Sequence, residues 1–275
     1  MAKKILNSLY CGFNGREHTY DLVIPENFNG RFLLFMHGFM GFKDWGCWSL
    51  MMDHFIAQGF GFCRFNVTHN GTTPEQPNVF VDLNAFGNDS YLREYRDLDA
   101  MIGICAAELK EQDKLILIGH SRGGGMVLLG GLHPRVDCVI SLAGISSIEN
   151  RFPQGGALDD WKKTGVRYVH NSRTAQDLPQ YFVQYEEFEA NKSLLEIHAA
   201  CRKLKKPVLL IHGERDHSVA VSEGYQLAEW LGCELQVIEG EEHTFGAVHP
   251  WKRKDLPEGL KEVCTRIRAF AVELG

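Results

Sequence analysis

The sharpest chemical pattern in the sequence is Gly119-His120-Ser121-Arg122-Gly123, a serine with a glycine two positions before it and two positions after it. It follows the apolar run 115–118 and precedes a helical pattern. On such a strand-to-helix turn the backbone is strained, and glycines at this spacing allow the close approach that exposes a serine hydroxyl. The pattern predicts that Ser121 is a nucleophile. The alternative is a glycine-rich helix start whose serine only makes local hydrogen bonds.

A serine nucleophile needs a base, and the base needs an acid that orients it. Asp216 follows the apolar run 208–211 and His243 follows the run 235–238, so the chain order is serine, acid, histidine. We predict that His243 is the base and that Asp216 is the acid. The competing residues are Glu214 for the acid and His217 or His249 for the base.

Acyl transfer also needs two N–H donors for the oxyanion that develops on the carbonyl. One donor should be the backbone N–H of Arg122, the residue after the nucleophile. The other should follow an early strand, and the apolar run 32–36 leads into His37-Gly38-Phe39. Because Gly38 lets the chain turn sharply, we expect the Phe39 N–H to point at the reacting carbonyl.

These loops need a scaffold that brings them together, and apolar runs alternate with helical patterns along the chain. Most of the runs are four to six residues long and continuously apolar, which is typical of strands buried on both faces of a parallel sheet. The predicted strands are 20–24, 32–36, 61–65, 115–118, 138–142, 208–211 and 235–238. The predicted helices are 48–58, 91–111, 123–132, 222–231 and 260–274. This alternation predicts an α/β fold with a doubly wound, mostly parallel sheet.

One stretch, residues 145–206, breaks the alternation because it contains no strong strand pattern. Two capping-box patterns, Asp177-Leu-Pro-Gln180 and Ser193-Leu-Leu-Glu196, predict the starts of short helices there. We therefore expect one domain, 1–275, with an inserted helical lid at 145–206. The stretch is rich in aromatic residues, and we expect two or three of them to contact substrate unless they only pack the lid onto the sheet. They are Phe152, Trp161, Tyr168, Tyr181, Phe182, Tyr185 and Phe188.

Taken together, His37-Gly38-Phe39, the turn 119–123, Asp216 and His243 resemble the α/β-hydrolase fold over essentially the whole chain. Within that superfamily the chain most resembles small bacterial feruloyl/cinnamoyl-esterase and dienelactone-hydrolase-like enzymes, and serine peptidases related to prolyl oligopeptidase. One departure follows the strand at 61–65. Many relatives carry an R-G-H-G-x-S loop there, whereas this chain has Asn66-Val-Thr-His69-Asn70-Gly71-Thr-Thr.

The resemblance implies a serine hydrolase that cleaves carboxylic esters of small acyl or aromatic acids through an acyl-enzyme on Ser121. Two alternatives stay open. One is a serine peptidase or amidase that uses the same triad, and the other is a catalytically silent binding module.

Composition and motifs restrict the other function classes. The 275 residues are 44 % hydrophobic and 23 % charged, which excludes disordered and fibrous proteins. A net charge of −6 with dispersed charges disfavours nucleic acid as a partner. We expect no metal and no cofactor, because the sequence has no H-E-x-x-H, Cys/His quartet, P-loop or dinucleotide fingerprint.

The location follows from two further observations. No apolar run approaches the roughly 18 residues of a membrane span, so we expect no membrane association. The eight cysteines are scattered without a C-x-x-C pair, which is typical of reduced thiols in a cytoplasmic protein. We therefore expect a cytoplasmic enzyme that acts on a small-molecule ester, and the sequence leaves open whether it forms a homo-oligomer.

Overall fold

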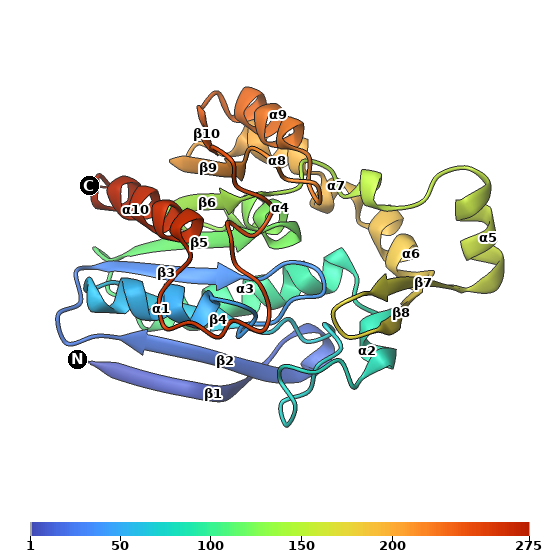
Figure 1. The fold of residues 1–275 in the computed structure, drawn as a ribbon, viewed down its shortest axis with the longest axis horizontal. Coiled ribbons are helices and arrows are strands. Elements are labelled where there is room, and N and C mark those ends of the chain that lie inside the picture. Colours follow the sequence, from blue (N-terminus) through green and yellow to red (C-terminus); the bar gives the residue numbers. More distant parts are fainter. Residues whose placement is uncertain (1, 275) are drawn as a thin grey trace.

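The computed structural model describes residues 2–274, and its central feature is an eight-stranded sheet (Figure 1). In their order across the sheet, the strands are β1 (Lys3–Cys11), β2 (Glu17–Ile24), β4 (Gly61–Phe65), β3 (Arg31–Met36), β5 (Lys114–His120), β6 (Cys138–Leu142), β9 (Val208–Gly213) and β10 (Leu235–Ile238). The pairs β1–β2 and β2–β4 are antiparallel, and all other neighbours in this sheet are parallel. The predicted mostly parallel α/β sheet is therefore confirmed, with β1 as an additional edge strand.

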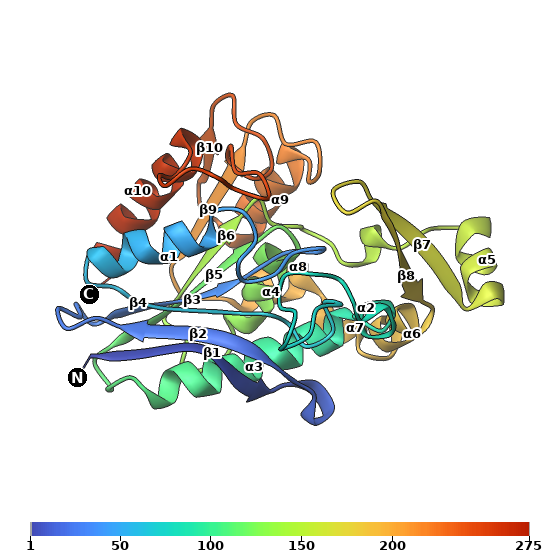
Figure 2. The same ribbon diagram turned by 60° about the horizontal axis from the view of Figure 1, so that its bottom comes forward.

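Helices cover both faces of the sheet (Figure 2). The helices outside the stretch between β6 and β9 are η1 (Phe13–Gly15), α1 (Trp48–Ala57), α2 (Leu83–Gly87), α3 (Tyr91–Ala107), α4 (Arg122–Gly130), α9 (Val221–Leu231) and α10 (Glu258–Val272). Side chains of α1 and α10 pack on one face of the sheet, whereas those of α3, α4 and α9 pack on the other. The five helices predicted from the sequence are all present, with shifted ends.

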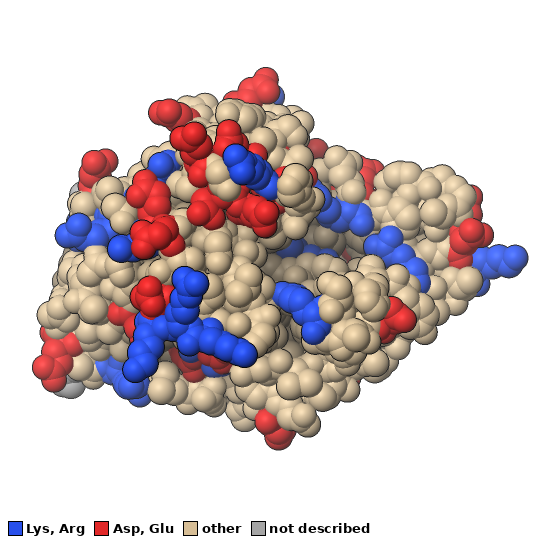
Figure 3. Space-filling view, in the orientation of Figure 1, with Lys and Arg blue, Asp and Glu red and all other residues tan. Residues whose placement is uncertain are grey.

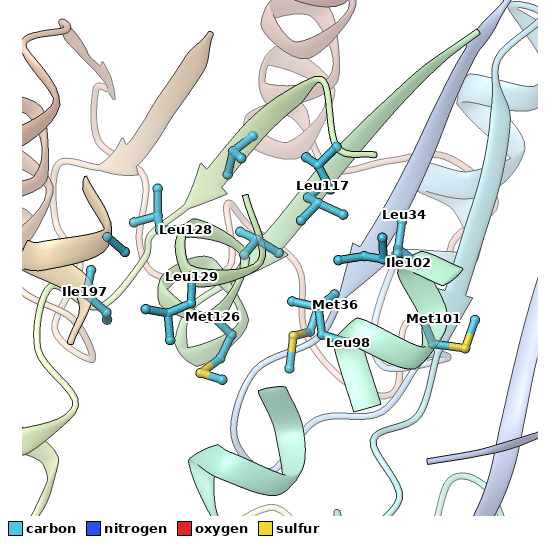
Figure 4. Close-up of a cluster of buried hydrophobic side chains, with 14 of the residues drawn as sticks. Leu34, Met36, Leu98, Met101, Ile102, Leu117, Met126, Leu128, Leu129 and Ile197 are labelled. Atoms are coloured by element: carbon cyan, nitrogen blue, oxygen red, sulfur yellow. The ribbon is translucent and has the colours of Figure 1, made fainter. Parts of the chain in front are cut away.

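Alternation along the strands divides the core between the two faces. In β3, Leu34 and Met36 belong to the cluster under α3 and α4, whereas Leu33 and Phe35 belong to the cluster under α1 and α10. Because both faces are covered by helices, successive side chains are all buried, which explains the continuously apolar strand sequences. Figure 4 shows the first cluster, in which strand residues Leu34, Met36 and Leu117 meet helix residues Leu98, Ile102, Met126 and Leu129.

The chain leaves the sheet between β6 and β9. The elements there are η2 (Glu149–Arg151), α5 (Gly156–Thr164), β7 (Val166–Asn171), β8 (Gln176–Tyr181), α6 (Val183–Ala190), α7 (Lys192–Leu195) and α8 (Ile197–Lys203). Strands β7 and β8 form an antiparallel hairpin that is separate from the main sheet. We call residues 149–195 the outer lobe, which lies at the right of Figure 1. Helix α8, by contrast, packs against α4 and α9.

Both capping boxes predicted in this stretch are wrong. Asp177 and Gln180 lie in β8, where the exposed Asp177 pairs with His170 of β7 and the buried Gln180 pairs with Arg167. Pairing with β7 therefore outweighs the local helix-start pattern. At the second box a helix is present, but α7 begins at Lys192, and Ser193 lies inside it without acting as a cap.

Candidate active site

A cavity of about 600 Å³ opens between the sheet and the outer lobe, and Figure 3 shows this hollow on the surface. Four of the five predicted site residues line it, namely Phe39, Ser121, Arg122 and His243. The fifth, Asp216, is buried beside His243. The loops that carry these residues follow β3, β5, β9 and β10, so the cavity lies at the carboxyl ends of parallel strands.

Ser121 stands between β5 and α4 with a strained backbone. Its φ is 59° and its ψ is −119°, in a region that non-glycine residues rarely adopt. The flanking glycines make this turn possible. A Cβ at Gly119 would lie 2.1 Å from the Gly123 carbonyl oxygen, and a Cβ at Gly123 would lie 2.5 Å from the His37 carbonyl oxygen. No side chain larger than hydrogen fits at either position without movement of the backbone.

His243 and Asp216 are joined directly. The Nδ1 atom of His243 lies 2.7 Å from Oδ2 of Asp216. The other carboxylate oxygen, Oδ1, accepts hydrogen bonds from the backbone N–H groups of Ser218 at 2.8 Å and Val219 at 2.9 Å. Burial alone would raise the pKa of Asp216, but the hydrogen bonds from His212 and His243 hold this pKa well below its usual range. An ionised carboxylate therefore fixes the imidazole through Nδ1 and leaves Nε2 for chemistry.

Two further histidines support this pair. The Nε2 atom of His120 donates to the carbonyl oxygen of His243 at 2.8 Å. Burial lowers the pKa of His120 to about 3, so its ring is neutral and acts as a simple N–H donor. The Nε2 atom of His212 lies 2.9 Å from the Val219 carbonyl oxygen and 3.2 Å from Oδ2 of Asp216. His120 thus supports the backbone of the base, and His212 supports the acid, and both supporting side chains are buried.

The loop after β3 passes directly over Ser121. A Cβ at Gly38 would lie 2.9 Å from Cβ of Ser121 and 3.4 Å from its Oγ atom. Among residues 2–274, neither the N–H of Phe39 nor that of Arg122 has a hydrogen-bond acceptor. Two free backbone donors therefore lie beside the serine, as an oxyanion would require.

The side chain of Arg122 connects these two donor residues. Its guanidinium carbon lies 4.2 Å from the ring centre of Phe39 and 4.4 Å from that of Tyr91. Its Nη1 atom donates to Oε1 of Glu94 at 2.8 Å. Burial opposes the charge, but Tyr91 and Glu94 raise the pKa of Arg122 above its usual value. The sequence predicts only a backbone role for Arg122, because nothing in it pairs this residue with Glu94.

The segment 66–73, which stands where many relatives carry the R-G-H-G-x-S loop, supports the Phe39 loop through hydrogen bonds. Asn70 Nδ2 donates to the Gly41 carbonyl oxygen at 3.2 Å, and the Val67 N–H donates to Nε2 of His37 at 3.3 Å. The segment is itself anchored on α3, since the Thr68 N–H donates to Oδ2 of Asp97 at 2.6 Å. The polar run is visible in the sequence, but its partners come from distant segments.

The competing residues lie apart from this arrangement. Glu214 accepts a hydrogen bond from the Gly240 N–H at 2.8 Å and is exposed. His217 is exposed and does not line the cavity. His249 accepts a hydrogen bond from the Gly46 N–H at 3.0 Å, and its ring stacks on Trp45. Of the candidates predicted from sequence, only Asp216 and His243 form an acid–histidine pair.

The expectation that aromatic residues of residues 145–206 contact substrate is not met by the geometry, since none of the seven lines the cavity. Most form the core of the outer lobe, where the ring centre of Phe152 lies 5.1 Å from that of Phe188 and 5.2 Å from that of Tyr185. Tyr168 is 64 % exposed. The outer lobe instead contributes Arg151, Arg167, Val169, Arg173 and Gln180 to the cavity wall.

Thiols, metal ligands and long apolar helices are the remaining features of residues 2–274 that bear on function. All eight cysteines are free thiols, and six of them are buried. Within these residues there is no group of three or more His, Cys, Asp or Glu side chains arranged to hold a metal ion. Over the same range, no helix has both the length and the apolar character needed to span a membrane.

Residues 33–253 match the model of the alpha/beta hydrolase family. No curated protein matches the chain. A structure of Est1E from Butyrivibrio proteoclasticus with bound ferulic acid is 17 % identical, with 97 % of this chain and 99 % of that chain covered and a TM-score of 0.72.

Two other similar structures are a monoacylglycerol lipase from Paleococcus ferrophilus and a putative dienelactone hydrolase from Klebsiella pneumoniae subsp. pneumoniae. The first is 16 % identical over 89 % of this chain and 95 % of that chain, with a TM-score of 0.64. The second is 13 % identical over 99 % of this chain and 98 % of that chain, with a TM-score of 0.59. At these identities the likeness establishes the fold alone.

Proposed function

The chain belongs to the alpha/beta hydrolase family, as its motifs predicted, and from this premise we propose that it is a serine hydrolase that cleaves small carboxylic esters. The observation that carries the proposal is the strained Ser121, which opens on the same cavity as the His243–Asp216 pair. Strain of this kind persists at functional sites because the surrounding structure enforces it.

In the proposed acylation step, Oγ of Ser121 attacks the ester carbonyl while Nε2 of His243 takes the hydroxyl proton. The tetrahedral intermediate then collapses, the carbon–oxygen bond to the alcohol breaks, and His243 returns the proton to the departing alkoxide. An acyl-enzyme on Ser121 remains. Water activated by His243 then attacks it, and the acid is released together with free Ser121.

The developing negative charge on the carbonyl oxygen would be stabilised by the backbone N–H groups of Phe39 and Arg122. Both are free of protein acceptors within residues 2–274, so no internal hydrogen bond must break when the oxyanion forms. Each such donor typically contributes about 10²–10³ to the rate. Asp216 would stabilise the imidazolium form of His243 during each proton transfer.

We assign a covering role to residues 145–206, whose outer lobe supplies one wall of the cavity. A volume of about 600 Å³ fits a small ester rather than a polymer chain. The proposed substrate is therefore a small-molecule ester, held between this lobe and the carboxyl ends of the strands.

The experiment that tests the proposal uses a fluorophosphonate probe, which reacts with activated serines, followed by peptide mapping. We expect the label on Ser121, and we expect Ser121→Ala to lose both the label and the hydrolysis of 4-nitrophenyl acetate. Ser222→Ala is the matched control, because Ser222 is exposed on α9 outside the cavity. Retained esterase activity in Ser121→Ala would refute the proposal.

A further inference from the structure

The β7–β8 hairpin presents one of its two faces to the cavity. Arg167 and Val169 of β7 line the cavity, as does Gln180 of β8, which lies directly opposite Arg167 in the strand register. The intervening residues Tyr168 and His170 are exposed. Because side chains alternate along a strand, this pattern directs Arg167 toward the cavity that contains Ser121.

The guanidinium of Arg167 is held in place on one side only. Its Nε atom donates to Oε1 of Gln180 at 2.9 Å, and its central carbon lies 4.5 Å from the ring centre of Trp161. Gln180 is buried and bonds in turn to Gln184. In the part of the chain that the structure describes, neither Nη atom of Arg167 has a hydrogen-bond acceptor, and no carboxylate forms an ion pair with it.

The other arginines on the cavity wall differ from Arg167 in their partners. Arg122 is paired with Glu94, and Arg151 is paired with Glu223. Arg173 is exposed at the rim and donates to the Met40 carbonyl oxygen. Figure 3 shows basic side chains along the hollow beside the outer lobe.

Among the described residues that line the cavity, Glu242 is the only acidic one, and it is also exposed. Arg167 and Arg173 therefore leave the wall with an excess of positive charge. Burial lowers the pKa of Arg167, while the nearby Tyr91 opposes this shift and the charge of Arg122 adds to it. A half-buried guanidinium without a counter-ion is unfavourable, and an anion bound in the cavity would remove that cost.

We propose that Arg167 binds a carboxylate group of the substrate, so that the enzyme acts best on esters that carry an ionised carboxylate in addition to the bond that is cleaved. Two free guanidinium N–H groups match the two oxygens of a carboxylate. The exposed charge of Arg173 adds attraction at the rim. The proposal rests on the proposed function, because it requires that Ser121, on the same cavity, is the reacting group.

The test compares two pairs of esters of matched shape and different charge. The anionic esters are the 4-nitrophenyl monoesters of adipic and suberic acid, and the neutral ones are 4-nitrophenyl 6-methylheptanoate and 8-methylnonanoate. The measured quantity is the ratio of kcat/KM for the anionic ester to kcat/KM for its neutral partner. For the wild type we expect this ratio to exceed one and to fall as NaCl is added, since salt screens partly exposed charges.

In Arg167→Met the ratio should fall by about tenfold or more, as expected for the loss of a charge-assisted bidentate contact. Arg167→Lys should retain part of the preference, because it keeps the charge but not the planar pair of donors. Lys163→Met is the matched control, since it removes one positive charge from the same lobe at an exposed site outside the cavity. Its ratio should equal that of the wild type.

Three outcomes would overturn the proposal. The first is a wild-type ratio of one or below for both chain lengths. The second is an equal loss on anionic and neutral esters in Arg167→Met, which would mean that Arg167 only holds the hairpin in place. The third is the absence of hydrolysis of every ester together with no fluorophosphonate label on Ser121, which would overturn the proposed function as well. Hydrolysis without charge preference would overturn the carboxylate site alone.

Discussion

Replacing Asp216 by asparagine should inactivate the enzyme while leaving the fold intact. The carboxylate has four partners, and the two oxygens serve different groups. Oδ1 accepts from two backbone N–H groups, at Ser218 and Val219, whereas Oδ2 faces His243 and His212. An asparagine keeps one oxygen and replaces the other with an NH₂ group, so its orientation decides which partners lose an acceptor.

The partners predict the orientation. If the NH₂ group faced the two backbone N–H groups, two donors would each meet a donor. Facing the histidines, it meets only one fixed donor, the Nε2–H of His212, which is committed to the Val219 carbonyl oxygen at 2.9 Å. The second arrangement is therefore favoured. The asparagine NH₂ then donates to Nδ1 of His243, and the ring proton of His243 must move to Nε2.

A histidine that carries its proton on Nε2 cannot accept one from Ser121. This change of tautomer typically lowers kcat by about 10⁴ in serine triads, which corresponds to roughly 5 kcal/mol at about 1.4 kcal/mol for each factor of ten. The assay is kcat/KM for 4-nitrophenyl acetate, with circular dichroism as the check on folding. Glu214→Gln makes the same chemical change at an exposed carboxylate near Asp216 in the sequence, and it should stay near the wild-type rate.

Two results would refute this reasoning. A loss smaller than about tenfold in Asp216→Asn would show that the orientation of His243 does not depend on this carboxylate. A larger loss in Glu214→Gln than in Asp216→Asn would show that the acid is misassigned.

The remaining predictions concern stability. Gly119→Ala should destabilise the fold by about 1–3 kcal/mol or more, because its Cβ would lie 2.1 Å from the Gly123 carbonyl oxygen. Gly103→Ala, on the exposed side of α3 with no atom within 4 Å, should instead stabilise the fold by about 0.5–1 kcal/mol. Urea unfolding measures both free energies, and equal effects of the two substitutions would contradict the steric argument. Burial lowers the pKa values of His18 and His120 to about 3 and those of His37 and His69 to about 4, while burial raises the pKa values of Asp89 and Asp97. Burial also lowers the pKa values of His54 and His249 and raises that of Glu241. Because these six histidines outnumber the three carboxyl groups, the unfolded chain binds more protons than the native one between about pH 6.5 and 4, so the free energy of unfolding should fall as the pH decreases, by about 1.4 kcal/mol per pH unit for each net proton. A free energy of unfolding that is flat or rises toward pH 4 would contradict this expectation.

The central strands could be predicted from the sequence because helices cover both of their faces. Burial on both sides leaves a continuous apolar run, as in β4 and β6, whose bounds match the prediction. Strand β1 was missed because it lies at the edge of the sheet, where most of its residues are exposed and polar residues interrupt the pattern. Strands β7 and β8 were missed for a related reason, since only their pairing with each other distinguishes them from loops.

Some residues of the candidate site could be predicted from the sequence in the same way, whereas others could not. Ser121, Asp216 and His243 could be found because each follows a strand, and the fold brings the carboxyl ends of parallel strands together. The partners of those residues could not be found, because they come from segments that nothing in the sequence connects. Glu94 reaches Arg122 from α3, and Arg167 reaches the cavity from a hairpin that was predicted as helix.

The stacked side chains of Phe39 and Arg122 have a consequence for anyone who wishes to change the selectivity of this enzyme. The two residues whose N–H groups border the serine also support each other through their side chains, and the ring of Tyr91 contacts the same guanidinium. Substitutions at these positions should therefore be strongly epistatic, since contacting residues rarely contribute additively. Single substitutions at residues 39, 91 or 122 should mostly disrupt the contacts among these three side chains. Variants with changed selectivity are therefore best sought in a library that randomises the three residues together.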